Sequence, residues 1–217
     1  MMTKITGKTD QIFWKYIRKD QLDTVEILVG KKHYYLPTII AVKKVFEGGI
    51  VLEERVEGVN LEEYLLKENK EFLEEEILEI GIQLCDALHF LHSNRPPIIH
   101  GDVKPENIMI SMEKPLRIRL IDVDEGVVWR TNERNHYSRG TIGYCSPEQR
   151  RGEAFDVKSD IYSVGKTLEF LYFGCKKKWK NRRLKKVINK ATATKEQDRY
   201  VTVLEMQQDL RTILYGR

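Results

Sequence analysis

Three polar side chains of different chemistry lie close together in the stretch HGDVKPENIMI, residues 100–110. Asp102, Lys104 and Asn107 lie within six consecutive positions, and Asp122 follows in the sequence LIDVD. Asp122 and Asn107 offer the oxygen ligands that suit Mg²⁺ when phosphates complete its coordination shell. Asp102 is then available to accept a hydroxyl proton, and Lys104 can neutralise charge on a transferring phosphoryl group. The pattern therefore favours phosphoryl transfer.

A long helix and a short strand must hold these side chains in place. The sequence LEEEILEIGIQLCDALHFLH places apolar residues at steps of three and four between Leu73 and His92, which predicts a helix with one buried face. The prolines of SNRPP end this helix, because proline cannot continue it. RIRLIDV predicts a short strand before Asp122, and residues 122–150 are expected to form a long loop. Further helices are predicted at residues 156–172, 182–192 and 199–214.

The first part of the chain has a different character. QIFWKYI and GGIVLEE are runs of β-prone residues, and one helix is predicted at about residues 20–32. Gly48-Gly49 is expected to form the turn of a hairpin. We therefore predict an α+β fold with two lobes. Residues 1–56 form a small, reduced, β-rich N-terminal lobe, and residues 57–217 form a larger, mainly helical C-terminal lobe.

Composition argues against several other classes of protein. The 37 Lys and Arg exceed the 33 Asp and Glu by only four, without a patterned basic face, so we expect no nucleic-acid partner. Cys85, Cys145 and Cys175 are widely spaced and form no CxxC pair, which favours a reducing compartment over a disulfide framework. No stretch approaches 18 apolar residues, and the first residues show no signal pattern. We expect a soluble cytoplasmic protein that does not act at a membrane.

Five motifs in chain order resemble eukaryotic-type Ser/Thr protein kinases. HGDVKPEN is similar to the catalytic loop H-x-D-x-K-P-x-N, and IDVD occupies the place of D-F-G. GTIGYCSPEQ (140–149) resembles the segment that ends in A-P-E, and DVKSDIYSVGKTL (156–168) resembles the helix after it. QDRYVTVLEM (197–206) resembles the last-helix region. The resemblance runs over residues 50–210 and implies a protein-kinase-like fold.

The resemblance also implies roles for single residues at the phosphoryl-transfer end. Asp102 would orient the substrate hydroxyl, and Lys104 would steady the γ-phosphoryl group of ATP. Thr141 would bond to both and shape a site that accepts Ser or Thr. Asn107 and Asp122 would hold Mg²⁺.

Other residues of these motifs are expected to be structural. Asp160 and Gly165 correspond to the buried Asp and Gly of the helix that follows A-P-E, and Arg199 should pair with Glu148. His100 should hold its loop rather than touch substrate.

At the nucleotide end the resemblance implies further contacts. Aligning EERVEGVNL with the connection between the family's two lobes puts Glu53 at the gatekeeper position. Glu54 and Val56 would then present backbone groups to adenine, and Met109 would pack beneath the ring, although it also reads as a core residue.

IFWK resembles the family's V-A-I-K strand and makes Lys15 the lysine that binds the α- and β-phosphates. Glu26 would be its partner on the following helix, or the two could be ordinary surface charges. Lys19 is a weaker candidate for the same role.

The sequence departs from the family's pattern at several points. Only 14 residues precede Lys15, with one glycine, so no G-x-G-x-x-G can be placed there, and we expect a minimal member with a truncated N-terminal lobe. Gly101 replaces the arginine of H-R-D, which would clamp a phosphorylated activation loop. Val123 and Asp124 replace the Phe and Gly of D-F-G. The basic run at residues 173–186 either docks an acidic or phosphorylated partner or forms a solvated face.

Three functions remain open at this point. The first is a Ser/Thr protein kinase that uses ATP and Mg²⁺ on a protein substrate, with Thr131, Ser138 and Thr141 as candidate autophosphorylation sites. The second is a pseudokinase, a nucleotide-binding or scaffolding module for a regulatory protein partner, suggested by the missing glycine loop. The third is a small-molecule kinase of the aminoglycoside or choline type, since those enzymes also use H-G-D. Lys104-Pro105 and the motifs at 140–149 and 156–168 argue against it.

Overall fold

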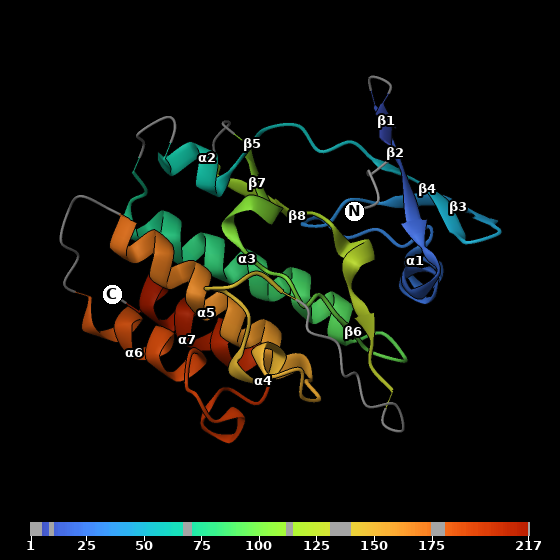
Figure 1. Ribbon diagram of the computed structural model, residues 1–217. Coiled ribbons are helices and arrows are strands. Elements are labelled where there is room, and N and C mark those ends of the chain that lie inside the picture. Colours follow the sequence, from blue (N-terminus) through green and yellow to red (C-terminus); the bar gives the residue numbers. More distant parts are fainter. Residues whose placement is uncertain are drawn as a thin grey trace.

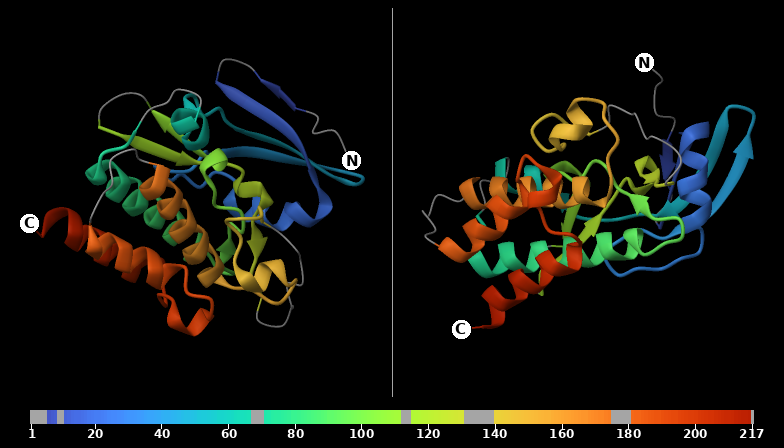
Figure 2. Two further views of the ribbon diagram at one scale, coloured as in Figure 1. Left: turned by 60° about the vertical axis from the view of Figure 1, so that its left-hand side comes forward. Right: turned by 90° about the horizontal axis from the view of Figure 1, so that it is seen from below.

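The computed structural model describes residues 6–8, 11–66, 71–111, 115–130, 140–174 and 181–216. An N-terminal antiparallel sheet is followed by a mainly helical region, and the two lie side by side in every view (Figures 1 and 2). This mixed arrangement confirms the predicted α+β fold class.

Four strands form the N-terminal sheet, in the order β1-β2-β4-β3 with all neighbours antiparallel. They are β1 (Thr6–Lys8), β2 (Ile12–Arg18), β3 (Ile39–Val45) and β4 (Gly48–Glu54). Helix α1 (Leu22–Leu28) follows β2 after a 3-10 turn, η1 (Lys19–Gln21), and packs against β3 and β4. The predicted helix at 20–32 is therefore too long. It ends early because Gly30 adopts a left-handed φ of 72°, as glycines after helix ends commonly do.

The hairpin between β3 and β4 turns at Phe46 and Glu47, so the prediction of a Gly48-Gly49 turn is wrong. Both glycines belong to β4, where Gly48 pairs with Arg18 of β2. A Cβ atom on Gly48 would lie 2.0 Å from the carbonyl oxygen of Ile17. Glycine is needed here for close approach of two strands rather than for a turn.

Helices build the C-terminal part, and α3 lies at its centre. Its apolar face packs on α5 and α7, which both run alongside it (Figure 2). The structure confirms the helix predicted between Leu73 and His92. The helices are α2 (Leu61–Leu66), α3 (Glu74–His92), α4 (Pro147–Arg150), α5 (Val157–Gly174), α6 (Arg182–Ala191) and α7 (Val203–Tyr215).

Helix α7 begins four residues later than predicted. The side chain of Thr202 accepts a hydrogen bond from the backbone N–H of Glu205 and so caps the helix. Arg199 and Tyr200 lie before this cap, where both side chains are buried. The start of the helix was mispredicted because the apolar pattern continues through these buried loop residues.

Short strands and turns between the two parts carry the polar motifs. One small sheet has the order β5-β7-β8 and the other pairs β6 with β9. The strands are β5 (Val59–Asn60), β6 (Ile98–Ile99), β7 (Ile108–Ser111), β8 (Arg117–Leu120) and β9 (Val127–Val128), and the 3-10 turns are η2 (Pro105–Asn107) and η3 (Val123–Glu125).

A long loop was predicted over residues 122–150, but η3, β9 and α4 lie in its described parts, 122–130 and 140–150. The hydroxyl of Ser146 caps α4, and Pro147 occupies its first turn.

Candidate active site

Asp102 lies at the centre of a hydrogen-bonded group that joins the loop of residues 100–107 to the segment starting at Gly140. Its Oδ1 accepts hydrogen bonds from both the backbone N–H and the hydroxyl of Thr141, each at 2.8 Å. Its Oδ2 lies 3.0 Å from Lys104 Nζ and 3.3 Å from the side-chain amide nitrogen of Asn107. Lys104 Nζ in turn donates to Thr141 Oγ1 at 2.6 Å. Three residues predicted to carry the chemistry are therefore in direct contact.

Helix α5 holds the backbone of the loop of residues 100–107 through Asp160. Asp160 is fully buried, and its carboxylate accepts the backbone N–H groups of His100 and Gly101 at 2.9 and 2.8 Å. The ring of His100 contacts the carbonyl oxygen of Ile121 at 3.0 Å and so ties this loop to the residue before Asp122. Asp160 and His100 have the structural roles expected of them.

Asp122 lies across from this group and has a left-handed backbone with φ 60° and ψ 34°. Among the described non-glycine residues, it alone has a positive φ. Asp tolerates this region better than most residues, and such strain concentrates at functional sites. Together with His100, Asp102, Lys104 and Asn107, it lines a pocket of about 290 Å³.

The donor chemistry of this pocket fits a magnesium ion held together with phosphates. Asn107 donates its amide hydrogens to Asp102, which leaves its carbonyl oxygen as the remaining acceptor. Asp122 adds a carboxylate, and both are the hard oxygen ligands that Mg²⁺ prefers. The described residues contain no cluster of three or more His, Cys, Asp or Glu that could bind a metal alone.

Lys15 lies in β2 with only 1% of its surface exposed. Its Nζ is 2.5 Å from Asp124 Oδ1 and 3.1 Å from Glu53 Oε1. It also donates to Asp122 Oδ1 at 3.2 Å. Burial alone would lower the pKa of the Lys15 ammonium, but the carboxylates of Asp124, Glu53 and Asp122 outweigh burial and raise its pKa. Lys15 is therefore a charged lysine beside the candidate metal ligand.

The predicted pairing of Lys15 with Glu26 is wrong. Glu26 lies in α1 with 39% of its side chain exposed and pairs with Lys44 of β3 at 2.6 Å. Because α1 begins only at Leu22, Glu26 lies on the face of the helix that meets β3. Lys19, the weaker candidate for the lysine, lies exposed in η1.

Glu53 and Asp124 are the partners of Lys15 that sequence analysis missed. Strand register could have indicated Glu53, since Phe13 pairs with Glu53 and Lys15 with Val51, which puts Lys15 and Glu53 on one face of the sheet. Burial raises the pKa of Glu53, opposed by Lys15 and reinforced by Asp124. Asp124 was recognised only as a departure from D-F-G, and sequence gave no indication of its contact.

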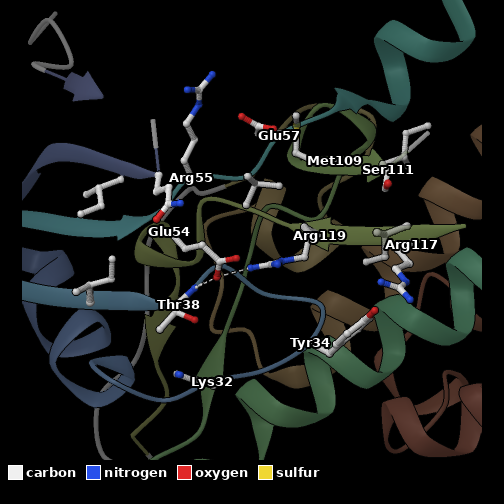
Figure 3. A pocket seen from close by; sticks show the side chains of 16 residues that line it. Lys32, Tyr34, Thr38, Glu54, Arg55, Glu57, Met109, Ser111, Arg117 and Arg119 are labelled. Atoms are coloured by element: carbon white, nitrogen blue, oxygen red, sulfur yellow. Dashed lines mark hydrogen bonds and ion pairs between the residues drawn. The ribbon is translucent and has the colours of Figure 1, made fainter. Parts of the chain in front are cut away.

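A larger cleft of about 1000 Å³ lies between the residues around Glu54 and strands β7 and β8 (Figure 3). Glu54, Val56 and Met109, the residues predicted to contact adenine, all line it. The carboxylate of Glu54 is occupied within the protein, because it accepts from Arg119 at 2.6 Å and from the backbone N–H of Thr38 at 3.1 Å. Burial alone would raise the pKa of Glu54, but the hydrogen bonds from Arg119 and Thr38 outweigh burial and lower it.

A buried ion pair anchors the segment that ends in S-P-E. Arg199 donates to the two oxygens of Glu148 at 2.7 and 2.8 Å, as predicted, and Ser159 donates to the same carboxylate at 2.7 Å. Despite burial, these hydrogen bonds lower the pKa of Glu148 to about 2. Thr131, Ser138 and residues 175–180 of the basic run lie outside the described residues.

Within the described ranges, no helix is both long and apolar enough to cross a membrane. Comparisons with known proteins show which proteins this chain is similar to. The chain is 35% identical to the serine/threonine-protein kinase PknB of Mycobacterium tuberculosis (strain ATCC 25177 / H37Ra) over 117 residues. The aligned region covers 53% of this chain and 18% of PknB. PknB of Mycobacterium leprae is 34% identical over 116 residues, covering 53% and 18%.

A leucine-rich repeat receptor-like serine/threonine-protein kinase of Arabidopsis thaliana is 31% identical over 168 residues, which covers 76% of this chain and 19% of that protein. The chain thus matches less than a fifth of the length of each of these relatives. The family model described as "Protein kinase domain" matches residues 7–214, which is nearly the whole chain. This match, over a chain with an N-terminal antiparallel sheet and a mainly helical region, shows that the chain belongs to the protein kinase domain family.

Proposed function

We propose that this protein transfers the γ-phosphoryl group of Mg-ATP to Ser or Thr hydroxyls of a protein substrate. The observation that carries the proposal is the contact of Asp102, Lys104 and Thr141 beside Asp122 and Asn107 in one pocket. The family match supports a phosphotransferase, and the names of the relatives support Ser and Thr as acceptors.

The geometry suggests how the protein groups act. Asp102 accepts a hydrogen bond from the substrate hydroxyl and receives its proton as that oxygen bonds to the γ-phosphorus. The bond from the γ-phosphorus to the bridging oxygen breaks, and that oxygen leaves on ADP. Lys104, 3.0 Å from Asp102, neutralises charge on the phosphoryl oxygens. Asn107 and Asp122 would hold the Mg²⁺ of the nucleotide, which supplies charge neutralisation for the phosphates.

Thr141 supports the choice of a Ser or Thr acceptor. Its hydroxyl donates to Asp102 and accepts from Lys104, so it fixes both side chains at the place where a substrate hydroxyl must arrive. A small aliphatic hydroxyl reaches Asp102 from a peptide chain close to this segment, whereas a tyrosine would hold the peptide farther away.

The direct test is transfer of radiolabelled phosphate from ATP to a generic protein substrate, with and without Mg²⁺. Wild-type protein should transfer phosphate only with Mg²⁺, and Asp102→Ala should lower the rate by about 100-fold or more, since it removes the proton acceptor. Asp198→Ala, at an exposed position in the 3-10 turn Glu196–Asp198, is the matched control and should keep the wild-type rate. Full transfer by Asp102→Ala would refute the proposed mechanism.

One observation favours a second candidate, a pseudokinase that binds without turnover. Among the described residues, none lines both the 1000 Å³ cleft with Glu54 and Met109 and the 290 Å³ pocket with Asp102. Buried Lys15 contacts Asp122, which lines the smaller pocket, and Glu53, which precedes Glu54 of the larger one. A nucleotide that reaches both must pass this cluster. Mg-ATP binding by calorimetry without any phosphate transfer would favour this candidate.

A cytoplasmic location is also part of the proposal. Cys85 and Cys145 are buried free thiols. Burial raises the pKa of both, so they are unreactive as structural thiols in a reducing compartment would be.

A further inference from the structure

The ammonium of Lys15 needs a permanent counter-charge. It is 1% exposed, and an unpaired charge at that depth is strongly unfavourable. Of its three carboxylate neighbours, Asp122 lines the 290 Å³ pocket and is the candidate metal ligand. When Asp122 binds a metal ion, the other two carboxylates must keep Lys15 paired.

Asp124 and Glu53 meet this need from two sides. Asp124 is 1% exposed and Glu53 is 6% exposed, and neither lines the 290 Å³ pocket or the 1000 Å³ cleft. They come from different elements, Asp124 from η3 and Glu53 from β4, and both carboxylates converge on the same Nζ. Lys15 itself lines neither the pocket nor the cleft, and of its three carboxylate neighbours Asp122 alone lines the smaller pocket, so these two acids can hold the lysine beside Asp122 without touching a ligand.

Asp124 is itself held by the start of α1. The side-chain amide of Gln21, which is 2% exposed, donates to Asp124 Oδ2 at 3.2 Å and to its carbonyl oxygen at 3.3 Å. One turn later the hydroxyl of Thr24 donates to the carbonyl oxygen of Gly126 at 2.9 Å. Neutral side chains therefore join the beginning of α1 to η3 and to Gly126, the residue after it. The two acids of α1 pair elsewhere, Glu26 with Lys44 and Asp23 with Arg130.

We propose that Asp124 and Glu53 are positioning residues that hold the Lys15 ammonium for the phosphates of the nucleotide, with Asp124 held by Gln21, the residue that precedes α1, and without an acid from α1. This assignment rests on the proposed function, since it needs a nucleotide at Asp122. Its consequence is that Lys15 stays in place without any acid from α1. An outward movement of Glu26 does not release Lys15, whereas a movement of η3 does.

The test is a double-mutant cycle on the affinity for Mg-ATP, measured by isothermal titration calorimetry. Asp124→Asn keeps the shape of the side chain and removes its charge, and it should weaken binding about tenfold, the scale of one charge-assisted hydrogen bond. Lys15→Met should weaken binding by at least as much. If Asp124 acts through Lys15, the double variant should bind no more weakly than Lys15→Met alone. Effects that multiply in the double variant would overturn the proposal.

Glu26→Gln is the matched control, since it also neutralises an acid that pairs with a lysine. Glu53→Gln should weaken Mg-ATP binding several-fold, and Glu26→Gln should leave it unchanged. Loss of affinity in Glu26→Gln equal to that in Asp124→Asn would return the role to α1 and contradict the assignment.

A second measurement needs no nucleotide and no Lys15 variant. Acetylation by isotope-labelled acetic anhydride, read by peptide mass spectrometry, reports how freely each lysine reacts. Lys15 should react slowly in wild type and in Glu26→Gln, and several-fold faster in Asp124→Asn. Lys186, exposed in α6 and distant in sequence from all three substitutions, is the internal reference. An equal Lys15 rate in all three proteins would overturn the assignment. If wild type binds no Mg-ATP while this pattern holds, the proposed function fails and the role of Asp124 in holding Lys15 stands.

Discussion

At the scale of single residues, the Glu148–Arg199 pair offers a test that does not depend on catalysis. Both side chains are buried, and the pKa of Glu148 is lowered to about 2 from its ordinary value of 4.5. Because the folded pKa lies below the unfolded one, the carboxylate contributes its full stability above about pH 4.5 and loses it as the pH falls towards 2. A shift of this size corresponds to about 3 kcal/mol.

We therefore expect the free energy of unfolding to fall more steeply for wild type than for Glu148→Gln between about pH 5 and pH 3. The variant starts from a lower stability, since Arg199 stays buried without its ion partner. Urea unfolding at several pH values measures both slopes. Glu153→Gln, which disrupts an exposed pair with Arg151, should change the slope little because solvent screens that pair. Equal slopes for wild type and Glu148→Gln would contradict the prediction.

Contacts between candidate site residues could be predicted from sequence where a motif determines short-range geometry. The Asp102, Lys104 and Asn107 stretch and its contact with Thr141 follow from one loop and one segment against it. Glu26 failed because its direction depends on where α1 begins, which the 3-10 turn η1 decides. Glu53 and Asp124 escaped because their contacts with Lys15 depend on strand register and on the docking of η3, which are tertiary features.

At the scale of elements, two helix glycines lie in tight contacts of different kinds: Gly165 faces atoms that cannot move easily, and Gly81 faces methyl groups that can. A Cβ on Gly165 of α5 would lie 2.8 Å from Ala191 Cβ and from Thr192 Cγ2 at the end of α6. The Ala191 Cβ is fixed to its backbone, so α5 and α6 must move apart. A Cβ on Gly81 of α3 would lie 2.9 Å from a terminal methyl of Leu210 and 3.2 Å from those of Leu168, which can rotate away.

Gly165→Ala should therefore destabilise the protein by about 1–3 kcal/mol, the usual effect of overpacking. Gly81→Ala is the matched comparison, and its smaller clash is offset by about 1 kcal/mol of better helix propensity. Urea unfolding of the two variants should place Gly81→Ala near wild type and Gly165→Ala clearly below it. The reverse order would show that the α5–α6 contact yields more easily than the methyl groups around Gly81.

Elements with a strong local pattern could be predicted, and those set by distant contacts could not. Helix α3 shows a regular apolar face over 19 residues, and β2 is rich in β-prone residues, so both were found. Gly48-Gly49 has the composition of a turn, yet these glycines allow β4 to approach β2 closely. Gly48, for example, packs against Ile17, which lies 31 residues earlier in the chain. Nothing local to the hairpin distinguishes these two uses of glycine.

At the scale of the whole molecule, the two predicted lobes share one hydrophobic core. Leu28, Leu36 and Val51 from the N-terminal part belong to the same buried cluster as Leu91 and Leu120 from the C-terminal part. Hydrogen bonds also join the two parts. Gln21 donates to Asp124 of η3, Thr24 donates to the carbonyl oxygen of Gly126, and the backbone N–H of Leu120 in β8 donates to the carbonyl oxygen of Tyr35. The predicted boundary at residue 57 therefore marks a change in composition, but the hydrophobic core extends across it without a break.

Continuous packing predicts one cooperative unfolding transition. Exposing the N-terminal sheet would uncover the apolar surface of the C-terminal part, so neither part should unfold far below the other. Differential scanning calorimetry should give a calorimetric enthalpy equal to the van't Hoff enthalpy. Leu36→Ala, at a 3% exposed position of this cluster, should lower the free energy of unfolding by about 2–5 kcal/mol and keep a single transition.

Hydrogen exchange distinguishes this result from independent lobes. If the core acts as one unit, the slowest amides of β4 and of α3 should exchange with the same free energy of opening, and Leu36→Ala should lower both together. Ile40→Ala, at a position that is 46% exposed in β3, is the control and should affect neither strongly. Two calorimetric transitions, with β4 losing protection while α3 keeps it, would instead establish residues 1–56 and 57–217 as separate folding units. In that case the contacts of Lys15 with Asp122 and Asp124 would form only when two independently stable bodies dock.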